Sequence, residues 1–240
     1  MKPYSGNRDP RFVAIHRGGD LDLATHRLLV AWAADCAEHV LPLFAKVHPN
    51  DARPSHAIAI AREWASGNAT VAQAREAAFG AHAAARESLN SAATEVARAA
   101  GHAVATAHMA DHELGAAAYA MRAVMKSVSK IDATQVAESE CRWQHDQLSD
   151  EIREMVLSDQ QNRNPKFKNV FLASPPWFVI SNPERVTLQI ETCIFASPSP
   201  PTCDFHRLRI LAVRDFHAAV SFYHASIARR TPSRIGCAAI

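Results

Sequence analysis

Apolar residues recur at spacings of three and four along most of the first 163 residues, which is the period of an amphipathic helix. Asp20 is expected to cap the first helix, and Pro42 to kink it or end it early. Alanine dominates between residues 72 and 123, and alanine is the best helix former. The pattern therefore predicts a helical domain from about Asp20 to Arg163. The apolar face of its first helix would be Leu28, Leu29, Trp32, Cys36, Val40 and Leu43.

Residues that favour helix ends divide this region further. Capping boxes at residues 70–73 and 132–135 open a third and a last helix, and Gly67 ends the second. The fourth and fifth helices could also be one long helix bent near Asp111. About six helices with short connections predict an all-α fold, an antiparallel multi-helix bundle or array. The predicted starts after the first helix are Pro54, Thr70, Ser91, Asp111 and Asp132. The large residues expected in the core are Trp32, Phe44, Trp64 and Phe79.

The composition changes after Asn164. Eight of the 13 prolines, seven of the 10 phenylalanines and three of the five cysteines lie beyond that residue. We therefore expect residues 1–164 to form the helical domain and residues 165–240 an irregular tail rich in Pro, Phe and Ser. Residues 186–190 alternate like a strand, residues 207–230 could be a helix, and residues 197–201 form a break. The tail is either a fused segment or the product of a shifted reading frame.

Charge and cysteine usage point to the cytoplasm. The net charge is +2, with +5 in residues 165–240 and −3 in the remainder. The basic residues of the tail are spread too thinly to predict nucleic-acid binding. The first 19 residues lack the apolar centre of a secretory signal, and we expect no membrane span. The five scattered cysteines, without a Cys-x-x-Cys pair, are typical of free thiols in a reducing compartment.

Two polar clusters suggest metal chemistry without completing a known motif. His108 and His112 are four residues apart, and one helix face would hold both imidazoles, but residue 116 is alanine where a zincin needs histidine. Asp35, Glu38 and His39 form the second cluster. One hypothesis is a helical metal-dependent hydrolase that uses all five side chains. The other is that these groups bond to each other or cap helix ends, and we favour it, so no metal is predicted.

Other catalytic patterns are missing from the sequence. No phosphate-binding loop, no Gly-x-Ser-x-Gly elbow and no thiol-protease signature is present, so the chain is predicted to be no enzyme and to need no cofactor. His82 and Arg86 are four residues apart and could form a ridge that recognises an acidic partner. The alternative, which we favour, is that the same pair belongs to a solvated helix face.

Several short sequence segments of the helical region, taken together, carry a resemblance to a known family. The most specific runs from Trp32 to Phe44, and its sequence is WAADCAEHVLPLF. Others are DPRFV at residues 9–13, RGGDL at 17–21, HRLL at 26–29, HAAAR at 82–86 and HELGAAAYA at 112–120. Glu140, Trp143, Gln144 and Leu148 continue the set, followed by EIRE at 151–154. Over about residues 9–164 the chain resembles immunity proteins of bacterial polymorphic toxin systems, in the family numbered five. Relatives known to us end soon after the last helix, so the tail departs from the pattern.

The resemblance implies a cytoplasmic antitoxin that binds and neutralises a co-encoded toxin, without catalysis or cofactor. It leaves the toxin unidentified. The polar positions that match the family are candidates for partner binding, and they could equally hold the bundle together. They are Asp35, Glu38, His39, His82, Arg86, His112 and Glu113. A further candidate surface comes from the acidic residues of the expected last helix, which could steer a basic toxin or simply be the wet side of an amphipathic helix. On it we select Glu151 and Glu154. The acidic residues of that helix are Glu138, Glu140, Asp146, Asp150, Glu151, Glu154 and Asp159.

Overall fold

The structure, a computed structural model, describes residues 4–171 and is all-α in that range. The predicted strand at 186–190, the break at 197–201 and the helix at 207–230 lie outside these residues. Seven α-helices form within residues 4–171, one more than expected. They are α1 (Leu23–Ala45), α2 (Arg53–Ser66), α3 (Val71–Glu87), α4 (Ser91–Ala105), α5 (Glu113–Ser127), α6 (Ala133–Asp146) and α7 (Asp150–Arg163). Four short 3-10 helices are η1 (Pro10–Phe12), η2 (Ile15–Arg17), η3 (Ala110–His112) and η4 (Asn164–Phe167).

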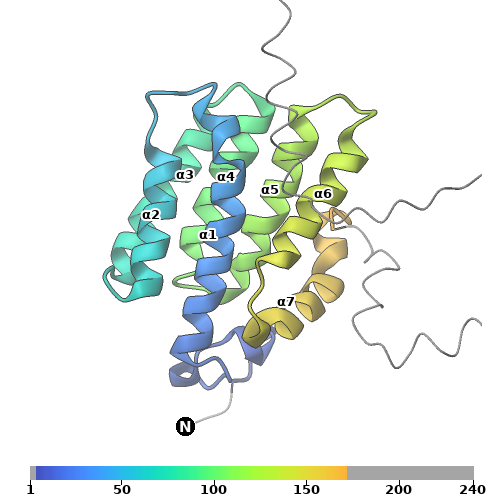
Figure 1. The fold of residues 1–240 in the computed structure, drawn as a ribbon. Helices are drawn as coiled ribbons and strands as arrows, with labels where there is room; N and C mark the ends of the chain where they lie inside the picture. The colour runs from blue at the N-terminus through green and yellow to red at the C-terminus, as the bar shows by residue number, and fades with distance from the viewer. Residues whose placement is uncertain (1–3, 172–240) are drawn as a thin grey trace, which may run out of the picture. The chain divides into compact units, whose positions relative to one another are not determined.

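Successive helices from α1 to α6 run up and down, as the short connections predict (Figure 1). Helix α4 packs against α1, α2, α3 and α5, and α1 packs against α2, α4 and α5. Helix α6 packs on α5, while α7 lies obliquely at the end that carries η1 and η2 (Figure 1). That end holds the start of α1, the end of α2, the start of α3 and the α4–α5 connection. It is called the N-terminal end below.

Helix α1 separates two hydrophobic cores, and this explains why it is so apolar. One core lies between α1 and α2–α5, consists largely of alanine, and includes Phe44 and Trp64. The other lies between α1, α5, α6 and α7 and includes Leu29 and Trp32. By length and composition alone α1 could cross a membrane, and half of its most apolar stretch is buried inside the fold. A central core helix meets the same criteria, and α1 is covered on two sides.

Two predicted helix ends are confirmed in detail. Gly67 ends α2 with φ +87°, where a side chain would be strained and a Cβ would lie 2.8 Å from the guanidinium of Arg27. The capping box of α3 is complete, because Thr70 accepts a hydrogen bond from the backbone of Gln73 and the Gln73 side chain accepts one from Thr70. In both cases the signal lies within four residues and needs no tertiary contact.

Three other predicted caps are wrong by one or two residues, and a fourth lacks its hydrogen bond. Asp22, not Asp20, caps α1, and Asn90 rather than Ser91 caps α4. Helix α5 follows His112 without a side-chain cap, so Asp111 is not its cap. Asp132 is the N-cap residue of α6, as predicted, but its side chain accepts no capping hydrogen bond, so the capping box is not formed. Helices α4 and α5 are separate, with η3 between them.

Pro42 neither ends α1 early nor stops its last turn. Helix α1 continues to Ala45. The backbone N–H of Lys46 donates to the Pro42 carbonyl at 3.1 Å, which retains helical hydrogen bonding beyond the proline. The missing N–H of a proline costs one hydrogen bond, and here the packing of Val40 and Phe44 on either side of it holds the turn in place.

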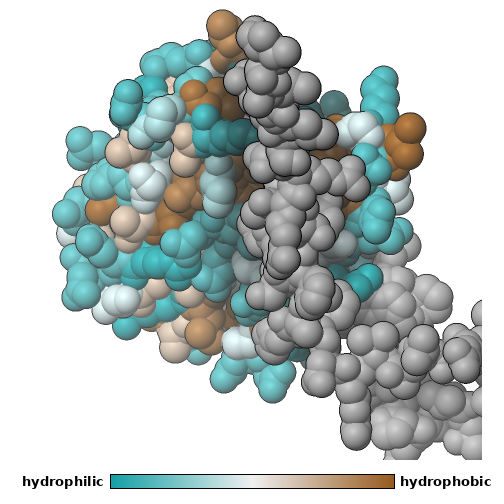
Figure 2. Space-filling model, turned by 45° about the horizontal axis from the view of Figure 1, so that its top comes forward, coloured by the Kyte–Doolittle hydropathy of each residue, from teal (hydrophilic) through white to brown (hydrophobic). Residues whose placement is uncertain are grey.

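The expected last helix is two helices, α6 and α7. The chain turns at residues 147–149 so that Leu148 enters the second core, where it is 2% exposed. A second correction concerns Phe79, which is 73% exposed rather than part of the core. On the face in Figure 2, hydrophilic residues cover most of the described surface and hydrophobic residues are exposed in separate patches.

The helical body continues past Asn164 to the end of the described chain. Phe171 is 2% exposed in the second core, and the Arg122 side chain donates to the Phe167 carbonyl at 2.9 Å. The division at residue 164 stays a prediction, and the first residues after it pack on the helices. Of the cysteines predicted to be free thiols, Cys36 is a buried free thiol, and burial raises its pKa. The tail cysteines lie outside the described range.

Candidate functional site

The polar candidates on α1 contact two different helices. Arg62 of α2 donates to Asp35 at 2.8 Å and also forms an ion pair with Glu38. All three side chains are at least one-third exposed, so the ion pairs link α1 and α2 at the surface. Such pairs contribute little to stability, but they occupy the carboxylates that a metal would need.

His39 faces the opposite neighbour, α6. Its Nδ1 lies 2.8 Å from Oε2 of Glu140, and its ring stacks on Trp143 with centroids 3.7 Å apart and planes 10° from parallel. Glu140 is buried, and its second oxygen accepts from the amide of Gln144 at 2.8 Å. His39, Trp143 and Val136 line a surface depression of about 730 Å³ between α1, α5 and α6.

His82 and His112 join a row of imidazoles across α3, α4 and the start of α5. The ring centroid of His102 lies 5.4 Å from that of His82 and 5.2 Å from that of His112. His108 continues the row, 5.4 Å from His112, and Tyr119 stacks on His102 at 5.0 Å. Arg86, predicted to form a ridge with His82, is exposed.

Burial holds the imidazole row in its neutral form. It lowers the pKa of His102 to about 3, with the neighbouring imidazoles of His112 and His82 adding to the effect. It also lowers the pKa values of His82, His108 and His112. The backbone makes room for the rings at two glycines. A Cβ at Gly101 would lie 2.6 Å from the His82 ring, and one at Gly115 would lie 2.4 Å from Nδ1 of His102.

Glu113 is fully buried in an ion-pair network. It lies 3.2 Å from Arg163, which also binds Asp159 of the same helix and the Asp111 carbonyl. Burial raises the pKa of Glu113 well above its usual value, although the charge of Arg163 opposes the rise. Arg8 in turn donates to Asp111 at 2.9 Å. The network therefore ties the N-terminal segment to η3, α5 and α7, and it leaves Glu113 no access to a partner as long as the fold is intact.

Glu151 and Glu154 are exposed on α7, as a docking role requires. The acidic surface is smaller than the sequence suggests, because Glu140 and Asp159 are buried and bound to protein groups. It is also divided between two helices. The exposed members are Glu138, Asp146, Asp150, Glu151 and Glu154.

The five side chains of the metal hypothesis do not come together. Asp35 and Glu38 bind Arg62, His39 binds Glu140, and the two imidazoles of His108 and His112 are part of the row beside α4. Within residues 4–171, no three His, Cys, Asp or Glu side chains are arranged to hold a metal ion. The geometry therefore gives the hydrolase hypothesis no support.

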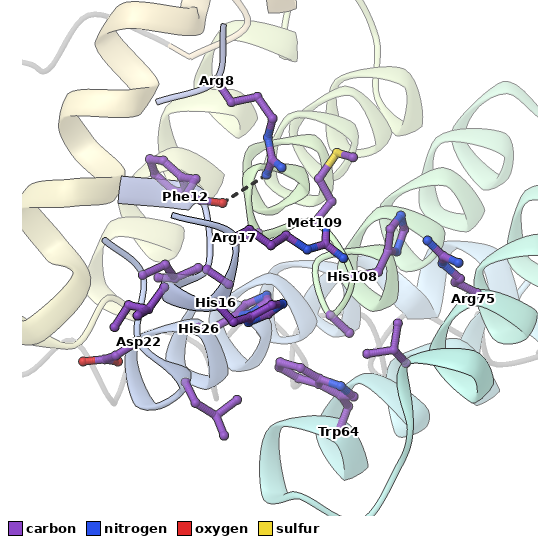
Figure 3. A pocket seen from close by; sticks show the side chains of 17 residues that line it. Arg8, Phe12, His16, Arg17, Asp22, His26, Trp64, Arg75, His108 and Met109 are labelled. Carbon is purple, nitrogen blue, oxygen red and sulfur yellow. Dashed lines mark hydrogen bonds between the residues drawn. The ribbon is translucent and has the colours of Figure 1, made fainter. Parts of the chain in front are cut away.

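A pocket of about 550 Å³ opens at the N-terminal end, and its chemistry is distinctive (Figure 3). The guanidinium groups of Arg17 and Arg75 lie on either side of His108 in Figure 3, and their charges lower the pKa of that imidazole further, although burial is the main cause. Trp64 and His26 form the floor, with ring centroids 4.8 Å apart. His26 is fixed by a 2.7 Å hydrogen bond to the Thr106 carbonyl.

Sequence reasoning missed this pocket. Arg17 appears in the sequence only as the first residue of the phrase at 17–21, and Arg75 belongs to no pattern. The walls of the pocket come from η1, η2, the ends of α1, α2 and α3, and the α4–α5 connection, so no local spacing could have brought them together. The available signal was the pair of phrases at residues 9–13 and 17–21, which contribute Phe12, Arg17 and Leu21 to the lining.

One comparison with known proteins gives a match. The family model described as Imm-5 like putative immunity protein matches residues 19–151, which span α1 to the first residues of α7. No curated protein and no solved structure matches the chain.

Proposed function

This chain belongs to the Imm-5 like family of immunity proteins, and from that membership we propose that it neutralises a co-encoded bacterial toxin by direct, reversible binding. The proposal includes a cytoplasmic location, a polymorphic toxin system and no catalytic step. The family match over residues 19–151 is the observation that carries it.

The arrangement of the polar side chains supports a binding rather than a catalytic role. Asp35, Glu38 and His39 are engaged by neighbouring helices, and Glu113 is buried in an ion pair. A general acid or base needs a free site within hydrogen-bond reach of a substrate. A folded helical array, by contrast, suits a protein that covers its target, because a preformed surface loses less conformational entropy on association.

The direct test is co-expression with the toxin encoded beside this gene. Cells that produce both proteins should survive, and the purified pair should migrate as one complex in size-exclusion chromatography. A catalytically inactive toxin variant serves to prepare the complex, and a chain deleted for α1–α3 serves as the negative control for rescue. If cells die while the full chain is soluble and abundant, and no complex forms, the proposal is wrong.

A titration separates neutralisation by binding from neutralisation by modification. If the chain acts by binding, toxin activity in vitro should fall in proportion to added chain and vanish near equimolar amounts. It should return when the complex is dissociated. Loss of toxin activity at a small fraction of equimolar chain, with an altered toxin mass, would instead show a catalytic antitoxin.

A further inference from the structure

We propose that the pocket at the N-terminal end receives an acidic loop of the partner, in which a carboxylate binds between Arg17 and Arg75 while apolar neighbours cover the rim. This inference rests on the proposed function and specifies which surface of the chain carries it.

The charge at the pocket is unbalanced. Arg17 and Arg75 are exposed, and neither has an ion-pair partner among residues 4–171. The third lining arginine, Arg8, is neutralised by Asp111. Asp22 is the only acidic side chain in the lining, and its carboxylate caps α1 by accepting from the backbone of Thr25 at 2.7 Å. Two guanidinium groups are therefore left to bind an anion.

Carboxylate is the anion that the surroundings favour. Guanidinium groups bind carboxylates with paired, charge-assisted hydrogen bonds. Between them lies His108, whose pKa is lowered by burial, so the positive charge of the pocket comes from the two guanidinium groups.

The rim indicates a protein rather than a free ion or a nucleic acid. Ile15, Leu23 and Val71 line the pocket and are 49%, 57% and 40% exposed. Large exposed apolar side chains next to arginine are typical of the centre of a protein–protein interface. A nucleic-acid site would be expected to have a longer track of cations, and the described pocket offers two.

The pocket is a better candidate site for holding the partner than the acidic residues of α6 and α7. Those acids are divided between two helices, and Asp150 is near Arg153, at 3.5 Å. They can speed up association, but a concave site with apolar walls and unpaired charges is better suited to hold a partner once it arrives.

The experiment measures the dissociation constant between the full chain and the inactive toxin encoded by the adjacent gene. The variant is Arg17→Glu/Arg75→Glu, and the matched control is Lys130→Glu, an exposed charge in the α5–α6 connection at the opposite end. We expect the double variant to bind at least about 30-fold more weakly and the control to bind within about twofold of the unmodified chain. Because neither arginine is ion-paired within the described residues, both variants should keep the unfolding midpoint.

Photocrosslinking gives a second, positional readout. Leu23→p-benzoylphenylalanine should crosslink to a toxin peptide containing Asp or Glu, whereas Leu89→p-benzoylphenylalanine, in the α3–α4 connection at the far end, should not. Charge reversal of that toxin acid to arginine should restore binding by the double variant.

The outcomes are distinct. If the unmodified chain binds no toxin, the proposed function itself fails. If it binds, and the double variant binds equally well without crosslinks from position 23, the function stands and the pocket inference is overturned. Binding of single-stranded RNA that is lost in the double variant, with toxin binding unchanged, would also overturn it.

Discussion

Replacing Gly115 with alanine should destabilise the protein, although alanine is the better helix former. A Cβ at this position would lie 2.4 Å from Nδ1 and 2.8 Å from Cγ of His102. The ring cannot easily move aside, because His82 and His112 are at its edges and Tyr119 stacks on it. Overpacking of this kind costs about 1–3 kcal/mol. The helical preference for alanine returns at most about 1 kcal/mol, so we expect a net loss of about 1–2 kcal/mol.

Gly80 is the matched control. It lies inside α3, and a Cβ there would meet nothing within 4 Å. The same chemical change, Gly80→Ala, should therefore stabilise the protein by about 0.5–1 kcal/mol. The two variants thus differ in the sign of their effect, which helix propensity alone cannot produce.

Urea unfolding of the full chain, followed by circular dichroism, measures both effects. A double-mutant cycle with His102→Ala then tests the cause, because removal of the ring should remove most of the penalty for alanine at position 115. If Gly115→Ala is as stable as the unmodified protein, or if its coupling energy with His102→Ala is below about 0.5 kcal/mol, the His102 ring can move away from a Cβ at position 115 and the reasoning is wrong.

Four further predictions follow from the structure. First, lowering the pH from 7 to 5 should reduce the free energy of unfolding, since burial lowers the pKa of His102 to about 3 while the unfolded chain takes up a proton near pH 6.5. The contribution of His102 to the free energy of unfolding is complete above about pH 6.5 and is lost as the pH falls. At pH 5 the loss from this one group is about 2 kcal/mol. The urea midpoint of the His102→Gln variant should therefore depend less on pH than that of the unmodified protein. Second, Glu151→Lys/Glu154→Lys should slow association with the toxin more at low salt than at high salt in stopped-flow measurements, and an unchanged rate at both salts would contradict the acidic docking surface. Third, a chain ending at residue 171 should unfold cooperatively. A chain ending at residue 164 should be less stable by at least about 2 kcal/mol, because it lacks Phe167 and the buried Phe171. Equal unfolding midpoints of the two chains would show that these rings contribute nothing to stability. Fourth, a chelator should leave the thermal midpoint unchanged, and a marked drop would reveal a bound metal.

The sequence predicts the helices well because their periodicity and end signals are local. Gly67 and the Thr70 box are examples. It fails by two residues at the start of α1, where Asp20 and Asp22 are both suitable caps. Tertiary structure decides between them. A parallel bridge joins Ala14 and Leu21, with the N–H of Leu21 donating to the Val13 carbonyl at 3.0 Å, so the chain stays extended until Asp22.

The predicted last helix, which is α6 and α7 in the structure, shows a different limit of prediction from sequence. The period of apolar residues continues from α6 into α7, with no glycine or proline between them. The break between α6 and α7 depends on the burial of Leu148 and on hydrogen bonds from Arg153. The Arg153 side chain donates to the Leu148 carbonyl and, at 3.0 Å, to the His145 carbonyl. These contacts exist only once the turn has formed, so the composition of the sequence does not predict them.

Spacing along one helix also gave an incomplete account of the candidate site. Asp35, Glu38 and His39 look like one cluster, but α1 lies between two neighbours, so the acids bind α2 and the imidazole binds α6. A ligand-like spacing therefore indicates contact between helices as readily as it indicates a site. The side chains best able to meet a partner are those whose charges the fold leaves unpaired, and Arg17 and Arg75 satisfy that condition at a concave, partly apolar surface. For an immunity protein this criterion is more informative than motif spacing, because its function depends on the groups that remain after folding.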